Sequence, residues 1–136
     1  MTHRVFVYGT LKRHFRNHAF LENAVFKGED VTAESVFDMI EVYSDQEPGG
    51  TYPAVVEGGC YSISGEVYEV NDEGLKVLDD LEDLGSLYKR EETALLHLGK
   101  AFMYIDIGNV AFKCETTPHI SRDTERKILS WVPNPT

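Results

Sequence analysis

The chain begins with an apolar run that breaks abruptly into a turn, and this break constrains the fold more than any other feature of the sequence. Four apolar residues in succession, 5–8, are typical of a strand that is buried on both faces of a sheet. Gly9 follows, and a glycine allows a backbone conformation or a close approach that a side chain would prevent. The backbone N–H groups of Thr10, Leu11 and Lys12 would then be free to bind an anion. An ordinary first strand that ends in a turn also fits these residues.

Length and charge limit the classes of protein that the chain can belong to. The 136 residues indicate one domain, 1–136, large enough to bury about two thirds of the surface that the unfolded chain exposes. A net charge of −10 would repel a phosphate backbone or an anionic membrane, so we expect neither nucleic acid nor a membrane as a partner. The chain has no apolar stretch of about 18 residues and no secretory leader, and we therefore expect a cytoplasmic protein.

Cysteine and histidine spacing indicates neither a disulfide scaffold nor a metal site. Cys60 and Cys114 are too few and too widely spaced, and we expect two reduced thiols. The five histidines lack the spacing of metal ligands, so we expect no metal. A nucleophilic Cys60 with His97 or His119 as its base is a weaker alternative, since buried inert cysteines are far commoner.

Strand-like segments outnumber helical ones. The predicted strands, besides the first, are one or two within 31–43 and one each at 52–56, 61–70, 88–98 and 101–112. The predicted helical segments are one turn at 19–21, a helix at 74–84 and a short helix within 123–131. Short turns join many of the strands, including a tight hairpin turn at Gly99 and Lys100. We therefore predict an α+β fold in which a mostly antiparallel sheet curves toward a barrel.

The helix predicted at 74–84 has Asn71 or Asp72 to cap its start and Gly85 to end it. On a helical wheel the apolar face comprises Gly74, Leu75, Val77, Leu78 and Leu81, and the solvent face comprises Lys76, Asp79, Asp80 and Asp83. Glu82 projects between Leu75 and Leu78, and it is the one acid of this helix that lies along the apolar face.

Burial of the Glu82 carboxylate, and the negative end of the helix dipole, would both raise its pKa. A carboxyl group with a raised pKa suits general acid–base chemistry near neutral pH. The alternative is a glutamate at the margin of the apolar face that turns to water or pairs with Arg90 or Lys89.

Several motifs together resemble the gamma-glutamylcyclotransferase-like superfamily, which includes the AIG2-like proteins and the gamma-glutamylamine cyclotransferases. The motifs are Tyr8-Gly9-Thr10-Leu11-Lys12-Arg13, Asn17-His18, Tyr52-Pro53-Ala54, Gly65-Glu66-Val67-Tyr68, and Leu78-Asp79-Asp80-Leu81-Glu82 with Tyr88-x-Arg90. Their order and separations also agree over residues 4–106. The chain departs from the family pattern at His14, where many relatives have glycine, and Ser121-Arg122-Asp123 is at best a remnant of the family's Gly-Asp-Trp-like segment.

The resemblance implies a small mixed β-barrel with a few packed helices, and a C-terminal extension at 115–136. It also implies a cofactor-independent gamma-glutamyl cyclotransferase that releases 5-oxoproline and an amine or amino acid by intramolecular attack. The position that matches the family's general acid/base is Glu82, and the matching substrate-binding loop is Tyr8, Gly9, Thr10 and Leu11. Tyr52, Tyr88 and Tyr104 are further candidates to line the substrate pocket, although core or rim aromatics are commoner at such positions.

Two other functions fit the same residues. One is a non-catalytic module that binds an amino-acid-like ligand, and the other is hydrolysis or acyl transfer at a gamma-glutamyl amide in the same site. We expect a small-molecule partner and a monomer or weak homodimer.

Overall fold

The computed structural model describes residues 1–13, 15, 17–43, 50–82, 84–85, 87–108 and 113–132. The strands are β1 (Thr2–Val7), β2 (Val25–Val31), β3 (Phe37–Tyr43), β4 (Thr51–Glu57), β5 (Ser62–Asn71), β6 (Tyr88–Ala94), β7 (Lys100–Asp106), β8 (Ile120–Asp123) and β9 (Ile128–Trp131). The helices in this part of the chain are the 3-10 turn η1 (His18–Leu21) and α1 (Asp72–Leu81). The α+β prediction is confirmed, with one α-helix among the described residues in place of a few.

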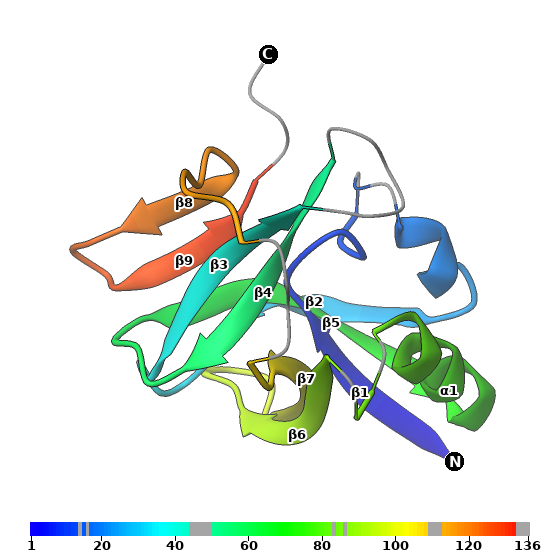
Figure 1. The fold of residues 1–136 in the computed structure, drawn as a ribbon. Coiled ribbons are helices and arrows are strands. Elements are labelled where there is room, and N and C mark those ends of the chain that lie inside the picture. The colour runs from blue at the N-terminus through cyan, green and yellow to red at the C-terminus, as the bar shows by residue number, and fades with distance from the viewer. Residues whose placement is uncertain are drawn as a thin grey trace.

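The strands form one seven-stranded sheet and one two-stranded sheet. The larger sheet runs β6-β7-β1-β5-β9-β8, with β2 also paired to β5, and β3 pairs with β4 in the smaller sheet. Most pairs are antiparallel, but β1 is parallel to β7 and β5 is parallel to β9, so the sheet is mixed as predicted. The sheet curls into a half-barrel, with α1 packed at one end and the β3–β4 pair lying across it (Figure 1).

The first strand is buried on both faces, as its apolar run predicts. Phe6 packs into one hydrophobic cluster, and Val5 and Val7 pack into a second cluster. Successive side chains of a strand point to opposite faces, so β1 separates the two cores. At its C-terminal end, Tyr8 and Gly9 lie next to β4.

Two predicted strands match the structure closely, and others have different bounds. Segments 52–56 and 61–70 correspond to β4 and β5. Segment 31–43 contains one strand, β3, while β2 ends at Val31 and was not predicted. Val25 and Phe26 of β2 are exposed, so β2 lacks the alternating apolar pattern that marks a half-buried strand. The hairpin turn includes Gly99 at a φ of 82°, but β7 already begins at Lys100 and ends at Asp106.

The predicted helix within 123–131 is wrong, because this segment forms part of a β-hairpin. Strand β9 pairs in parallel with β5, which places Ile128 opposite Ser62 and Leu129 opposite Ile63. Leu129 and Trp131 are buried, so the apolar residues follow the two-residue period of a strand. The first residues of β5, Ser62 and Ile63, lie beyond its pairing with β1 and supply the backbone partners that the sequence alone does not reveal. Residues 133–136, expected to be frayed, lie outside the described residues.

Buried Glu41 joins this hairpin region to the β3–β4 pair. The Glu41 side chain is 1% exposed. It accepts a hydrogen bond from the Thr51 hydroxyl at 2.8 Å and from the backbone N–H of His119 at 3.1 Å, and its Oε2 lies 2.8 Å from His119 Nδ1. The His119 ring also lies 5.2 Å from the Trp131 ring. A buried carboxylate is stable only with such partners, so this network holds β3, β4 and the C-terminal hairpin together.

The helix α1 begins two residues earlier and ends three residues earlier than predicted. Asn71 caps it by accepting the backbone N–H of Gly74 at 2.8 Å. Because the last helical residue is Leu81, Glu82 is the C-cap and Gly85 lies beyond the helix end. Leu75 and Leu78 are buried as predicted, whereas Val77 is 45% exposed. The buried face is therefore narrower than the wheel indicates, since Val77 lies outside it.

Within the described residues no helix has the length and apolar character needed to cross a membrane. Both cysteines are free thiols, with Cys60 exposed and Cys114 buried. A search of the same residues finds no group of histidine, cysteine and acidic side chains that could hold a metal ion.

Candidate active site

The turn after β1 is closed by its own backbone and by Asn17. The Lys12 N–H donates to the Gly9 carbonyl at 3.1 Å, and the Asn17 N–H donates to the Thr10 carbonyl at 2.9 Å. Asn17 Nδ2 also donates to Thr10 Oγ1 at 2.8 Å. The prediction that the Lys12 N–H binds an anion is therefore wrong, since that group closes the turn. The bonds that fix Thr10 use its carbonyl and hydroxyl oxygens as acceptors.

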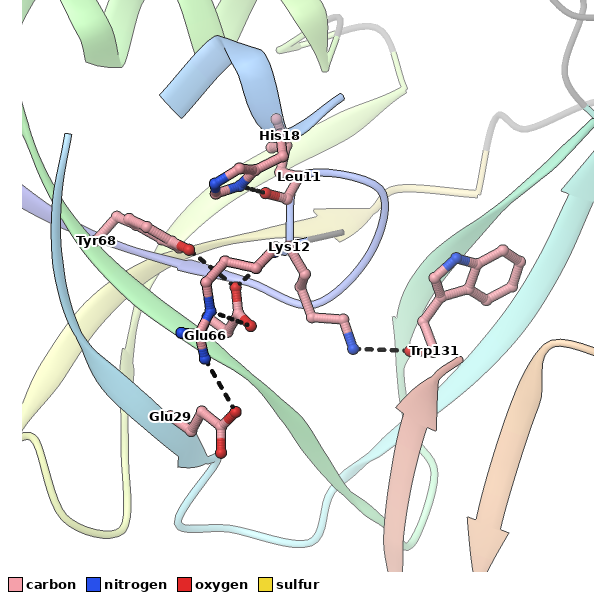
Figure 2. A network of polar contacts seen from close by, with 8 residues as sticks. Leu11, Lys12, His18, Glu29, Glu66, Tyr68 and Trp131 are labelled. Atoms are coloured by element: carbon pink, nitrogen blue, oxygen red, sulfur yellow. Dashed lines mark hydrogen bonds and ion pairs between the residues drawn. The ribbon is translucent and has the colours of Figure 1, made fainter. Parts of the chain in front are cut away.

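Glu66 of β5 anchors the far end of this turn. The Glu66 side chain is 9% exposed, and its Oε1 accepts the Arg13 backbone N–H at 2.9 Å and the Tyr68 hydroxyl at 3.0 Å. The Arg13 guanidinium bridges Glu66 and Glu29 at 3.5 and 3.4 Å. Figure 2 shows Glu66 between Tyr68 and Glu29 at the centre of this network. Because these partners come from β2 and β5, the turn is tied to two strands of the sheet.

Lys12 and His18 connect the middle of the turn to its surroundings through polar contacts (Figure 2). The Lys12 ammonium donates to the carbonyl of Trp131 in β9 at 2.7 Å, and burial lowers the pKa of this lysine. The His18 Nδ1 lies 2.9 Å from the Leu11 carbonyl. The Thr10 carbonyl is thus turned toward Asn17, and the Leu11 N–H of the same trans peptide unit points to the opposite side.

Gly9 is required here because β4 approaches it closely. A Cβ atom built on Gly9 would lie 2.6 Å from Pro53 Cγ and 3.0 Å from Pro53 Cδ, and real Cβ atoms do not approach other heavy atoms so closely. The proline ring is held inside β4, so it has little freedom to move away. This contact sets Tyr52 and Ala54 directly beside the turn.

Tyr8 and Tyr104 lie together between β1 and β7. The Tyr8 hydroxyl donates to the Tyr104 carbonyl at 2.8 Å and accepts the Val55 N–H at 3.4 Å. The Tyr104 hydroxyl donates to Asp79 Oδ1 at 2.6 Å, and the Arg90 guanidinium also pairs with Asp79. Asp79 was expected on the solvent face of α1, but its side chain is 19% exposed because these two partners draw it toward the sheet.

Glu82 is half-buried at the end of α1, and its negative charge affects the pKa values of nearby tyrosines. Burial is the largest cause that raises the pKa values of Tyr8, Tyr88 and Tyr104, and the negative charge of Glu82 raises all three further. The charge of Glu82 thus acts on three of the four tyrosines that the sequence singles out. Lys89, considered above as a partner of Glu82, pairs with Glu57 at 2.5 Å and Glu91 at 3.1 Å.

The Tyr88 hydroxyl is a buried polar group with no hydrogen-bond partner among the described residues. Tyr88 is 3% exposed. Burial first, and then the neighbouring Tyr8, Glu82 and Tyr52, raise its pKa. Nearly all buried polar groups in proteins are hydrogen-bonded, and an unpaired one calls for an explanation. A hydroxyl held among these groups is well placed to bind a polar atom of a ligand.

The structure brings Tyr8, Tyr88, Tyr104 and Glu82 to one place, and Gly9 brings Tyr52 beside them. Thr10 and Leu11 lie in the same turn, so none of the predicted site residues lies in a remote part of the fold.

Sequence reasoning missed Asp106, whose charge also raises the pKa values of Tyr8 and Tyr88. Asp106 lies directly opposite Tyr88 in the β6–β7 ladder, and the register of the hairpin would have revealed it.

Comparison with known proteins identifies related chains. A family model described as gamma-glutamyl cyclotransferase, AIG2-like matches residues 5–120. The chain is 37% identical over 107 residues to a Vibrio cholerae protein provisionally named a gamma-glutamylcyclotransferase, and the match covers 77% of this chain and 83% of that protein. It is 38% identical over 91 residues to the gamma-glutamylaminecyclotransferase of Mus musculus, a match that covers 63% of this chain and 58% of the mouse protein. The crystal structure of an AIG2-like protein from Mus musculus has a TM-score of 0.63 and 26% identity to this chain, with 99% and 98% of the two chains covered.

Proposed function

Since the chain belongs to the gamma-glutamyl cyclotransferase, AIG2-like family of enzymes, we propose that it cyclises a gamma-glutamyl amide to 5-oxoproline and a free amine or amino acid. The observation that carries this proposal is the half-buried Glu82 carboxylate beside Tyr8 and the unpaired Tyr88 hydroxyl. A carboxylate next to hydroxyl donors, in a site partly shielded from water, suits proton transfer to and from a bound amine.

The reaction needs no nucleophile from the enzyme and no cofactor. The α-amine of the gamma-glutamyl group attacks its own side-chain carbonyl, a C–N bond forms and closes a five-membered lactam, and the amide C–N bond to the leaving amine breaks. Holding the substrate folded, so that amine and carbonyl are within reach, supplies a large part of the rate enhancement. The proton lost by the attacking amine must reach the departing amine, and Glu82 accepts it and returns it.

The turn and the tyrosines bind the glutamyl group in this scheme. The N–H groups of Thr10 and Leu11 hold the α-carboxylate or the developing oxyanion, where donors in a water-poor site are most effective. Gly9 allows the Pro53 ring to pack directly against this turn. The Tyr88 hydroxyl donates to a substrate oxygen, which pairs the polar group that the free protein leaves without a partner.

The test is turnover of a panel of gamma-glutamyl amides, followed as 5-oxoproline by mass spectrometry, with the Glu82→Gln variant. We expect this variant to lose about 10²–10⁴-fold in kcat, the range for a positioned acid–base group. Asp80→Asn is the matched control, since Asp80 is an exposed acid of the same helix and its loss changes the net charge equally. Thermal melting of both variants separates lost chemistry from lost folding.

Three results would contradict the proposal. Turnover of Glu82→Gln within a few-fold of the parent would remove Glu82 from the chemistry. Release of glutamate in place of 5-oxoproline would indicate hydrolysis. Binding of gamma-glutamyl compounds in a calorimeter without any product would indicate a binding module.

A further inference from the structure

The segment that carries Glu82 connects α1 to β6, and backbone hydrogen bonds fix it near both ends. The Leu84 N–H donates to the Asp79 carbonyl of α1 at 3.0 Å. The Gly85 N–H donates to the Tyr88 carbonyl of β6 at 2.8 Å. The backbone on the C-terminal side of Glu82 is therefore bonded to the helix before it and to the strand after it.

Three side chains, Asp79, Arg90 and Tyr104, form a polar cluster that joins the same helix to β6 and β7, and we call it the Asp79 cluster. The Arg90 guanidinium of β6 pairs with Asp79 Oδ2, and the Tyr104 hydroxyl of β7 donates to Asp79 Oδ1 at 2.6 Å. Arg90 and Tyr104 lie directly opposite each other in the β6–β7 ladder, so both donors project from one face of the sheet. Because Asp79 precedes Glu82 and Arg90 follows it, the ion pair spans the segment that carries Glu82.

The Asp79 cluster is partly shielded from water. The side chains of Asp79 and Arg90 are 19% and 25% exposed, and Tyr104 is buried. The Arg90 guanidinium also lies 4.9 Å from the centre of the Phe102 ring. Charge-assisted hydrogen bonds are stronger and more directional in such surroundings than ion pairs on an exposed surface, which contribute little. The cluster is therefore suited to hold α1 in one position on the sheet.

Tyr104 connects the Asp79 cluster to the candidate active site. Its backbone carbonyl accepts the Tyr8 hydroxyl at 2.8 Å, while its own hydroxyl donates to Asp79. Burial is the largest cause that raises the pKa of Tyr104, the hydrogen bond to Asp79 comes next, and the charge of Glu82 adds to both. The same residue thus contacts Asp79 and Tyr8 directly and responds to the charge of Glu82.

We propose that Asp79 is a positioning residue for Glu82. With Arg90 and Tyr104 it holds the C-terminal end of α1 against β6 and β7, and this fixes the Glu82 carboxylate relative to the bound substrate. The inference rests on the proposed function, because Glu82 is the acid–base group that Asp79 positions. Proton transfer needs this precision, since a displacement of about 1 Å can cost about 10²-fold in rate.

The experiment is a double-mutant cycle on kcat and KM, with release of 5-oxoproline from one gamma-glutamyl amide as the readout. We expect Asp79→Asn to lower kcat by about 10- to 100-fold. Its KM should stay within about twofold of the parent value, because the turn at Thr10 and Leu11 binds the glutamyl group in the proposed scheme. In the Glu82→Gln protein the same substitution should cost less than about twofold more, because a residue that acts through Glu82 has no effect once Glu82 is gone.

Asp80→Asn is the matched control, because Asp80 is the exposed neighbour of Asp79 on the same helix and its loss changes the net charge equally. We expect this control to keep the parent kcat and KM. If Asp79→Asn fails to fold, Arg90→Gln breaks the ion pair from β6 and should give the same fall in kcat and the same small effect in the Glu82→Gln protein.

The outcomes separate this inference from the proposed function. Losses in kcat that multiply in the double variant would show that Asp79 acts independently of Glu82, and they would overturn the inference while the cyclisation stands. A higher KM for Asp79→Asn at an unchanged kcat would overturn it in the same way. Absence of 5-oxoproline with the parent protein, over the whole panel of amides, would overturn the proposed function together with the inference.

Discussion

Replacing Tyr88 by phenylalanine should stabilise the free protein and weaken its activity at the same time. The hydroxyl is buried and has no hydrogen-bond partner among the described residues. An unpaired buried polar group costs about 1–3 kcal/mol of stability, and phenylalanine keeps the ring while removing that group. The opposite signs of the two effects make this variant informative.

The expected sizes follow from the chain length and from the lost hydrogen bond. For 136 residues, a gain of about 1 kcal/mol raises the melting temperature by about 3.5 °C. Loss of one hydrogen bond to substrate should lower kcat/KM by about tenfold, equivalent to about 1.4 kcal/mol. The activity loss should be the same for substrates that differ only in the leaving amine if the hydroxyl contacts the glutamyl group.

Tyr104→Phe is the matched control for this prediction. The Tyr104 hydroxyl donates to the Asp79 carboxylate at 2.6 Å, so its removal should destabilise the protein by about 2 kcal/mol. Differential scanning calorimetry and steady-state release of 5-oxoproline measure both quantities. A Tyr88→Phe protein that melts below the parent would refute the reasoning, since it would show that the hydroxyl already has a partner in the free protein. Unchanged kcat/KM would show that the hydroxyl does not meet the substrate.

Two further predictions concern the turn and the tyrosines. Gly9→Ala should lower the free energy of unfolding by about 1–3 kcal/mol and reduce turnover. Adding Pro53→Ala to the same chain should restore part of both, because it removes the ring atoms 2.6 and 3.0 Å from the new Cβ. Additive losses in the free energy of urea unfolding and in kcat would contradict this prediction. Burial raises the pKa values of Tyr8, Tyr68, Tyr88 and Tyr104. The folded protein therefore keeps protons that the unfolded chain releases above about pH 10. The free energy of unfolding should keep its full value below that pH and decline above it. Each tyrosine contributes up to about 1.4 kcal/mol per pH unit, and urea midpoints that stay level from about pH 9 to about pH 11 would contradict the burial of these phenols.

The sequence predicts those parts of the fold whose cause is local. Both the odd-numbered and the even-numbered residues of the run 5–8 are apolar, and β1 separates two hydrophobic cores as a result. The Asn71 cap of α1 is one of the two caps that the sequence offers, and the end of β4 follows from Gly58, which has a φ of 90°. These features depend on backbone conformation and on periodicity, which neighbouring residues determine.

The parts that the sequence does not predict depend on distant partners. The segment with Leu129 and Trp131 is equally compatible with a short helix, and pairing with Ser62 and Ile63 at the start of β5 makes it a strand. Asp79 lies on the polar side of a helical wheel, but Arg90 and Tyr104 draw it inward. The short motifs name Tyr8, Gly9 and Glu82, whereas Asp106 becomes visible only when the hairpin register is known.

The protonation states at the site determine which group can transfer a proton. Because burial raises the pKa values of Tyr8, Tyr88 and Tyr104, these phenols keep their protons at neutral pH and act as donors rather than bases. Asp79 is engaged by Arg90 and by the Tyr104 hydroxyl, so its charge is already compensated.

Among the described carboxylates at the site, Glu82 lies at the end of α1, and its negative charge raises the pKa values of these three tyrosines. The proposed roles are therefore that the phenols donate hydrogen bonds to the substrate and that Glu82 moves the proton. This assignment predicts a kinetic signature for Glu82, because loss of the acid–base group should lower the rate for every gamma-glutamyl amide, whatever its leaving amine.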